Sequence, residues 1–358
     1  MKFKGYSGKK VFVAMSGGVD SSVAAALLKE AGCEVFGVTM CFDSLFPYTK
    51  KVVAKAKEIA KYLSISHYTV DFADMLSQEV IKVFISEYLE GRTPNPCVYC
   101  NRAIKFGRLW NRVRSMGAEY LATGHYARIV YNDTFNRFEL YRGYDKKKDQ
   151  SYFLSFIKKD VLPFILFPLG EMTKEDVYKQ ARLFGLKLAD HKESQDICFI
   201  PEGDYKEFIR QQAGEQAFVK GVFKDEAGNI VGEHQGIVNY TIGQREKLGI
   251  ALGRRVYVYK IDSNANTIFV GDKDNLTVQK FTAVKLNWLV EIPKKNMELG
   301  ICVRYNAAEV KARIFELNND VVYIEVLSPC TAIAPGQFVV FYKRGLVLGS
   351  GVIDRVLE

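Results

Sequence analysis

The segment over residues 11–28 constrains the fold more than any other part of the chain. An uninterrupted apolar run at 11–15 is typical of a strand buried on both faces of a parallel sheet. It leads into Ser-Gly-Gly-Val-Asp-Ser-Ser at residues 16–22, and then into a helical pattern that ends at Gly32. This order brings main-chain N–H groups, hydroxyls and the positive end of a helix to one point. We therefore predict an anion-binding loop at residues 16–22.

Strand and helix patterns alternate through the first 125 residues. Apolar strand patterns recur at residues 34–40, 67–70 and 120–123, with helical spacing between them. Such alternation predicts a doubly wound parallel sheet, an α/β fold. Ligands bind such sheets at the carboxyl ends of the strands, where the loop at 16–22 and the turn at Gly124 both fall. We expect this domain to cover residues 1–200.

The pattern changes after about residue 200. Glycine-rich sequence between Gly228 and Gly243 predicts a small central linking domain over 201–270, without a clear secondary-structure signal. Short strand patterns then predict a small antiparallel β-barrel, and we expect the C-terminal domain to cover 271–358. The strand patterns assigned to the barrel are at 256–261, 267–270, 310–314, 322–326, 338–342 and 346–352.

Composition and charge bound the class of protein. Of the 358 residues, 48% are hydrophobic and 25% are charged, which excludes disordered, collagen-like and coiled-coil proteins. No apolar run reaches the roughly 18 residues of a membrane span, and residues 1–18 lack the apolar stretch of a secretory signal. We therefore expect a cytoplasmic protein with no membrane partner.

Positive charge is concentrated in one part of the chain. Residues 101–150 hold 11 basic and 5 acidic side chains, whereas the whole chain carries a net charge of +9. This local surplus indicates a phosphate-rich partner. The alternative explanation of the same surplus is a lysine-rich face that is exposed to solvent and binds no partner.

The loop at 16–22 has neither the GxxxxGK[ST] spacing of Walker proteins nor the GxGxxG spacing of dinucleotide folds. Its Asp20 would repel a phosphate unless a cation such as Mg²⁺ lay between them. Residues 16–21 resemble the pyrophosphate loop of the PP-loop ATPases, which cleave ATP between the α and β phosphates and adenylate an oxygen of their substrate. The resemblance implies ATP and Mg²⁺, and it leaves the acceptor open.

Three cysteines lie in polar, loop-like sequence. Cys97 and Cys100 form a CxxC between two prolines and a basic stretch, and neighbouring cations would stabilise a thiolate there. Cys198 lies far along the chain after an acidic stretch. A structural zinc site would need a fourth ligand, and His125 and His191 lack zinc-finger spacing. Cysteines in apolar segments are expected in the core, and these are Cys33, Cys302 and Cys330. The sequence pattern does not assign Cys41 to the core or to a site.

Several motifs together resemble the tRNA-specific 2-thiouridylase (MnmA) family, nearly from end to end. They are TPNPCVYCN, IKFG, LATGHYAR, KDQSYFL, ESQDICFIP, QGIVNYTIGQR, RYN and APGQ. The resemblance implies ATP-dependent replacement of the C2 oxygen of the wobble uridine, position 34, by sulfur, with release of AMP and pyrophosphate. The implied substrates are the tRNAs for Lys, Glu and Gln. A sulfur donor protein is also implied, and the sequence does not identify it.

The same resemblance assigns roles to individual residues. It implies that Cys198 carries sulfur as a persulfide and that Cys100 is its partner thiol, which would leave a Cys100–Cys198 disulfide for reduction. The positions that match the family's nucleotide contacts are Ala14, Met15, Ser16, Gly17, Gly18, Val19, Asp20, Ser21, Met40 and Gly124. The positions that match its tRNA contacts are Asn95, Pro96, Cys97, His125, Lys148, Asp149, Gln150, Arg304, Tyr305 and Gln337.

One position departs from the family pattern, because many members have an aspartate where this chain has Cys97. A thiol transfers protons near neutral pH only when its surroundings lower its pKa. The proton-transfer role assigned to the family's aspartate therefore does not carry over directly to Cys97. The third thiol allows an alternative cofactor. In that alternative Cys97, Cys100 and Cys198 ligate three irons of a [4Fe–4S] cluster, and the open iron binds sulfide.

Two other functions fit parts of the sequence. A small-molecule adenylating ligase of the same superfamily, such as an argininosuccinate synthetase, would leave the thiols incidental and would release AMP in response to an amino acid. A tRNA-binding protein without chemistry would have no use for Asp20 and would show no ATP turnover.

Overall fold

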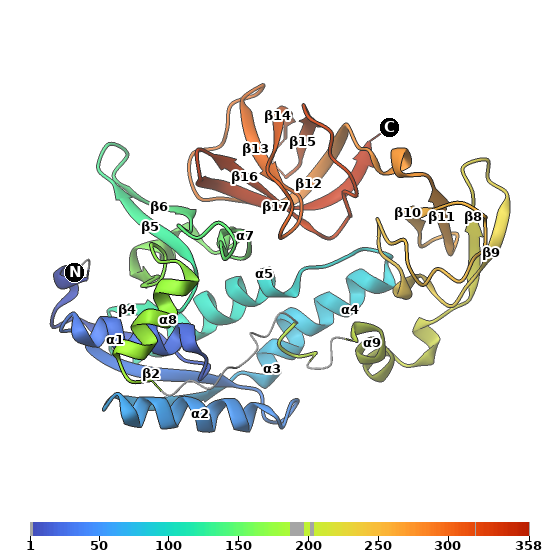
Figure 1. The fold of residues 1–358 in the computed structure, drawn as a ribbon. Coiled ribbons are helices and arrows are strands. Elements are labelled where there is room, and N and C mark those ends of the chain that lie inside the picture. The colour runs from blue at the N-terminus through green and yellow to red at the C-terminus, as the bar shows by residue number, and fades with distance from the viewer. Residues whose placement is uncertain (1–2, 187–196, 201–203, 319, 358) are drawn as a thin grey trace. The chain divides into compact units, whose positions relative to one another are not determined.

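The computed structural model describes residues 3–186, 197–200, 204–318 and 320–357 (Figure 1). His191, the first four residues of the ESQDICFIP motif and its last residue, Pro201, lie outside these ranges. The chain forms two compact units. Unit 1 comprises Met1–Glu79, Cys97–Gln195 and Arg344–Val347, and unit 2 comprises Val80–Pro96, Asp196–Lys343 and Leu348–Glu358. In the described part of the chain, no helix is both long and apolar enough to cross a bilayer.

Unit 1 is built on a parallel sheet, as the strand–helix alternation predicted. Its five strands have the order β3-β2-β1-β4-β7. The central strand β1 buries Val11, Phe12 and Val13 almost completely, because it has a neighbour on either side. The strands are β1 (Lys10–Ala14), β2 (Glu34–Cys41), β3 (Ser66–Asp71), β4 (Tyr120–Ala122) and β7 (Ile165–Leu166).

Helices follow the strands of this sheet (Figure 1). Buried residues of β1, α1 and α8 pack in one apolar cluster, which includes Val13, Val23 and Val177. An antiparallel hairpin of β5 (Ala127–Asn132) and β6 (Arg137–Arg142) follows β4, and the sequence did not predict it. The helices of unit 1 are α1 (Val19–Glu30), α2 (Thr49–Tyr62), α3 (Ala73–Leu76), α6 (Trp110–Ser115), α7 (Ser151–Leu154) and α8 (Lys174–Leu183).

The cysteine helix α5 (Pro96–Cys100) continues directly into a π-helix over Asn101–Leu109. Another π-helical stretch, Ser77–Ile81, joins α3 to α4 (Lys82–Leu89), so residues 73–89 form one interrupted helix. Wider π turns of this kind frequently occur at functional sites.

The first part of unit 2 contains a four-stranded sheet in the order β10-β11-β8-β9. Its core includes Phe223, Val258 and Ile268, all fully buried. The strand patterns at 256–261 and 267–270 belong to this sheet, so their assignment to the barrel was wrong. The reason is that β11 pairs with β8, which the glycine-rich pattern did not reveal. The elements are α9 (Tyr205–Ala213), β8 (Gly221–Lys224), β9 (Ile230–His234), β10 (Tyr257–Asp262) and β11 (Thr267–Gly271).

The predicted antiparallel barrel is confirmed at the C-terminal end of the chain. Six strands follow the order β12-β15-β14-β13-β16-β17, and β12 also pairs with β17, so the sheet closes on itself. Closure leaves no unpaired strand edge. Phe281, Ile324 and Phe338 are fully buried. The strands are β12 (Lys280–Trp288), β13 (Glu298–Cys302), β14 (Val310–Leu317), β15 (Val322–Val326), β16 (Phe338–Lys343) and β17 (Leu346–Leu357).

Candidate active site

The loop at residues 16–22 follows the end of β1, as predicted, and its residues 19–22 form the first turn of α1. Its own hydroxyls hold it in shape: Ser16 N donates to Ser21 Oγ at 3.2 Å, and Ser22 Oγ donates to Gly18 O at 2.7 Å. Gly17 has φ +71°, which favours glycine. The N-cap of α1 is Gly18, and no side chain caps this helix. The first N–H groups of α1 therefore remain for an anion.

Asp20 in this loop is bound by two side chains that the sequence did not single out. Lys174 Nζ donates to both carboxylate oxygens, at 2.7 and 2.8 Å. The hydroxyl of Tyr126 donates to Oδ1 at 2.7 Å. The Lys174 side chain is only 11% exposed and begins α8, whose N-cap Thr173 forms a capping box. The chain itself thus places a cation beside the phosphate loop. These groups suit a polyphosphate and its metal ion.

Gly124 packs directly on the same loop. A Cβ atom at this position would lie 2.8 Å from the carbonyl carbon of Asp20 and 2.8 Å from Ser21 N. Main-chain atoms cannot swing aside as a flexible side chain can. The turn after β4 therefore requires glycine because of this close approach.

We expect Gly124→Ala to lower ATP turnover, measured as tRNA-dependent pyrophosphate release, by about 100-fold, because the added methyl group displaces the phosphate loop. Gly5→Ala is the matched control, since a Cβ at Gly5 meets nothing within 4 Å. Equal turnover by the two variants would show that the loop tolerates displacement.

The carboxyl ends of β1 and β2 lie side by side, near the positions expected to contact the nucleotide. Met15 N donates to Val38 O at 2.8 Å, and Thr39 Oγ1 donates to Met15 O at 2.8 Å. Thr39 Oγ1 also lies 2.8 Å from His67 Nε2, and burial lowers the pKa of that imidazole. Met40 follows half-buried. Ala14, Met15 and Met40 therefore share one edge of the sheet with the loop.

His125 stands next to Gly124 with its Nδ1 atom 2.7 Å from Thr123 Oγ1. Burial, with a smaller contribution from Lys105, holds the pKa of its imidazole well below the usual value near 6.5. The ring is therefore neutral at pH 7, and it lies against Phe106 and Phe167.

The segment at 148–150 is tied to the same region through Tyr126. Gln150 Oε1 accepts from Tyr126 N at 3.0 Å. The Asp149 carboxylate accepts from Arg142 Nη1, Gly143 N and Ser151 N, all at 2.9–3.0 Å. Its side chain is 7% exposed. Asp149 thus has a structural role, and the contacts of Lys148, Asp149 and Gln150 with tRNA stay predictions.

Cys97 and Cys100 lie three residues apart on α5, so their side chains share one helix face. Cys97 is half-buried and Cys100 is buried. The next residue, Asn101, is 2% exposed and donates from Nδ2 to Phe153 O at 3.0 Å. Its Oδ1 atom has no hydrogen-bond partner in the described structure. A buried polar side chain, that of Asn101, therefore follows Cys100 directly.

Cys198 is exposed and lies in unit 2, whereas Cys100 lies in unit 1, so their pairing stays a prediction. Over the ranges that the structure describes, no three His, Cys, Asp or Glu side chains gather closely enough to hold a metal ion. Cys97 and Cys100 supply two thiols on one helix face, and a cluster would need a third. The other four cysteines are buried: Cys33, Cys41, Cys302 and Cys330. Burial was expected for all of these except Cys41.

The remaining positions expected to contact tRNA lie in unit 2. Arg304 is exposed and Tyr305 half-buried, and both follow β13. Asn95 and Pro96 precede the cysteines. Gln337 is half-buried and donates from Nε2 to Thr93 O at 2.9 Å. None of these positions is shown in contact with tRNA, and their roles stay predictions.

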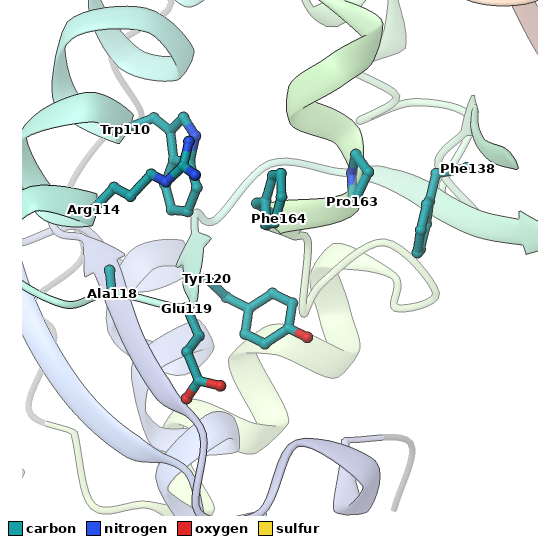
Figure 2. Close-up of a pocket in the computed structure, with 8 residues that line it drawn as sticks. All are labelled: Trp110, Arg114, Ala118, Glu119, Tyr120, Phe138, Pro163 and Phe164. Atoms are coloured by element: carbon teal, nitrogen blue, oxygen red, sulfur yellow. The ribbon is translucent and has the colours of Figure 1, made fainter.

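A shallow pocket of about 390 Å³ lies elsewhere in unit 1 (Figure 2). Trp110 stacks on Phe164 with ring centroids 5.3 Å apart, and Glu119 and Tyr120 also line the pocket. Tyr120 pairs with Val11 at the amino end of β1. The phosphate loop lies at the carboxyl ends of these parallel strands, so this pocket is not part of the candidate site.

Three family models together cover most of the chain. Residues 9–202 match the tRNA methyl transferase HUP domain, residues 206–272 the tRNA methyl transferase PRC-barrel domain, and residues 278–353 the aminomethyltransferase beta-barrel domain. Fold and phosphate loop thus define the class: a nucleotide-binding α/β domain followed by two β modules.

Full-length relatives then identify the family. Proteins named tRNA-specific 2-thiouridylase MnmA from Carboxydothermus hydrogenoformans and Moorella thermoacetica are each 44% identical; the matches cover 98% and 97% of this chain, and 98% and 99% of the relatives. The MnmA 1 protein of Caldanaerobacter subterraneus subsp. tengcongensis is 44% identical over 358 residues, with 97% and 98% covered. The chain belongs to the tRNA-specific 2-thiouridylase (MnmA) family, and it is a transferase.

Proposed function

We propose that this enzyme replaces the C2 oxygen of uridine 34 in tRNA by sulfur, in a reaction that consumes ATP. The observation that carries the proposal lies in unit 1, where helix α1 has no side-chain cap and Lys174 pairs with Asp20 in its first turn. The same chain bears the cysteines of α5. The names of the 44% identical relatives support the substrate. The proposed substrates are the tRNAs for Lys, Glu and Gln.

The first proposed step is adenylation. The C2 oxygen of uracil attacks the α phosphorus of ATP, and the bond from that phosphorus to the departing pyrophosphate breaks. The C2 oxygen then leaves as part of AMP, a far better leaving group than the free carbonyl oxygen. The main-chain N–H groups of the loop and Lys174 would stabilise the charge on pyrophosphate. Asp20 would hold Mg²⁺, which neutralises phosphate charge when bound.

The second proposed step transfers sulfur. A donor protein delivers a sulfane sulfur to Cys198, whose exposure suits access by another protein. The terminal persulfide sulfur attacks C2 and AMP departs. The Cys100 thiolate then attacks the sulfur of Cys198, which breaks the S–S bond and releases 2-thiouridine. Two electrons come from the thiols, so the resulting Cys100–Cys198 disulfide requires an external reductant before the next turnover.

We propose that tRNA is held by both units. The basic surplus at 101–150, with His125 and residues 148–150, would serve in unit 1, and Arg304, Tyr305 and Gln337 would serve in unit 2. Binding through phosphates should weaken steeply with added salt. We also propose three domains, with boundaries near residues 200 and 270.

Mass analysis of nucleosides tests the function. Purified enzyme, tRNA, ATP, Mg²⁺, a reductant and a sulfur source should yield 2-thiouridine, with one AMP and one pyrophosphate released per modified base. Omission of ATP is the control. AMP release driven by an amino acid without tRNA would favour the ligase alternative, and no ATP turnover would favour the binding protein. Iron-free enzyme that thiolates tRNA would eliminate the cluster formed by Cys97, Cys100 and Cys198.

A further inference from the structure

We propose that Arg92 and Gln337 are positioning residues for the cysteines of α5. The proposal deepens the proposed function, because it concerns the thiols that would handle sulfur. The anchored segment is Thr93-Pro94, which ends three residues before Cys97. Arg92, this segment and Gln337 all belong to unit 2.

The turn before β16 binds both N–H and carbonyl groups of this segment. Gln337 Nε2 donates to Thr93 O at 2.9 Å and to Pro94 O at 3.5 Å, and Thr93 N donates to Pro335 O at 2.7 Å. Gly336 has φ +90°, and a Cβ atom there would lie 2.9 Å from Thr93 N. Prolines 94 and 96 have no N–H, so their segment is held mainly through carbonyl oxygens, together with the N–H of Thr93.

Arg92 comes directly before this segment, and its side chain binds the barrel strand β17. Its Nε atom donates to Glu87 Oε2 at 2.6 Å, and its Nη atoms donate to Ile353 O at 3.0 Å and Asp354 O at 3.3 Å. The side chains of Arg92 and Glu87 are 19% and 9% exposed. The planar guanidinium suits several acceptors at once. Ile353 N also donates to Gln337 O at 2.8 Å, so β17 joins the two anchors.

The consequence for the cysteines follows from chain connectivity. Proline fixes its own φ and restricts the residue before it, so few free torsions lie between the anchor at 93–94 and the start of α5 at Pro96. Cys97 and Cys100 occupy that helix. Gln337 was expected to touch tRNA, yet its amide nitrogen here serves the carbonyl oxygens of the cysteine segment. The segment that Gln337 holds thus leads directly into the cysteine helix.

The decisive variant is Gln337→Glu, which keeps the shape but places a carboxylate against two carbonyl oxygens. Iodoacetamide labelling of tRNA-free protein, mapped to each cysteine by mass spectrometry, should show Cys97 and Cys100 reacting about tenfold faster, because loss of the Nε2 hydrogen bonds favours local opening. Gln337→Lys retains a donor and should restore most of the protection. Asn318→Asp makes the same amide-to-acid change at an exposed barrel turn and should leave both rates unchanged.

Gln337→Met removes the donor without adding charge, and it should also accelerate labelling if the acidic variant folds poorly. Unchanged labelling of both cysteines in Gln337→Met would overturn the proposal, and weaker tRNA binding by the same variant would then make Gln337 a tRNA contact. The measurement uses no ATP, tRNA or sulfur donor. A wild-type enzyme that fails to thiolate tRNA would therefore refute the proposed function without altering this result.

Discussion

Cys198→Ala should abolish 2-thiouridine formation, by about 10³-fold or more, while tRNA-dependent pyrophosphate release stays within about twofold of wild type. The physical reason is that the two steps use different groups. In the proposed reaction, adenylation uses the phosphate loop of unit 1, whereas the persulfide would form on the exposed thiol of unit 2. Nucleoside mass analysis and a pyrophosphate assay on the same reaction measure the two steps separately.

Cys33→Ala is the control for this prediction. Its thiol is buried, and burial raises its pKa, so the thiolate needed for sulfur chemistry does not form readily. The control variant should thiolate tRNA normally. A Cys198→Ala enzyme that still makes 2-thiouridine would rule out the persulfide at this residue.

Asp20→Asn should lower tRNA-dependent pyrophosphate release by about 100-fold, since the amide loses the charge that would hold Mg²⁺. It also leaves the Lys174 ammonium, which is 11% exposed, without its carboxylate. We therefore expect a loss of stability in thermal unfolding as well. Glu30→Gln makes the same chemical change at an exposed site on α1 and should leave both properties unchanged.

The double variant Asp20→Asn, Lys174→Met separates the two effects of Asp20. Removing the buried ammonium should recover much of the stability that the single variant loses, because the two side chains are directly paired. Pyrophosphate release should not recover. If turnover returned with stability, neither Asp20 nor Lys174 would act directly on the phosphates or the metal ion.

The strongest local patterns predicted the architecture correctly. The buried strand, glycine-rich loop and helix at 11–28 were predicted in the right order, since each part depends on neighbouring residues only. The strand patterns at 256–261 and 267–270 were also recognised, but their partners were not. Strand pairing depends on segments distant in sequence, and here β11 joined β8 of the central sheet.

The sequence by itself determined the parallel α/β domain, the phosphate loop, the closed C-terminal barrel and the family, because hydrophobic period, glycine turns and motif spacing are local properties. Tertiary structure alone decided that Lys174, 154 positions from Asp20, meets its carboxylate, and that Gln337, 244 positions from Thr93, holds the entrance to the cysteine helix. Such contacts arise when separate segments pack together, and no spacing along the chain encodes them.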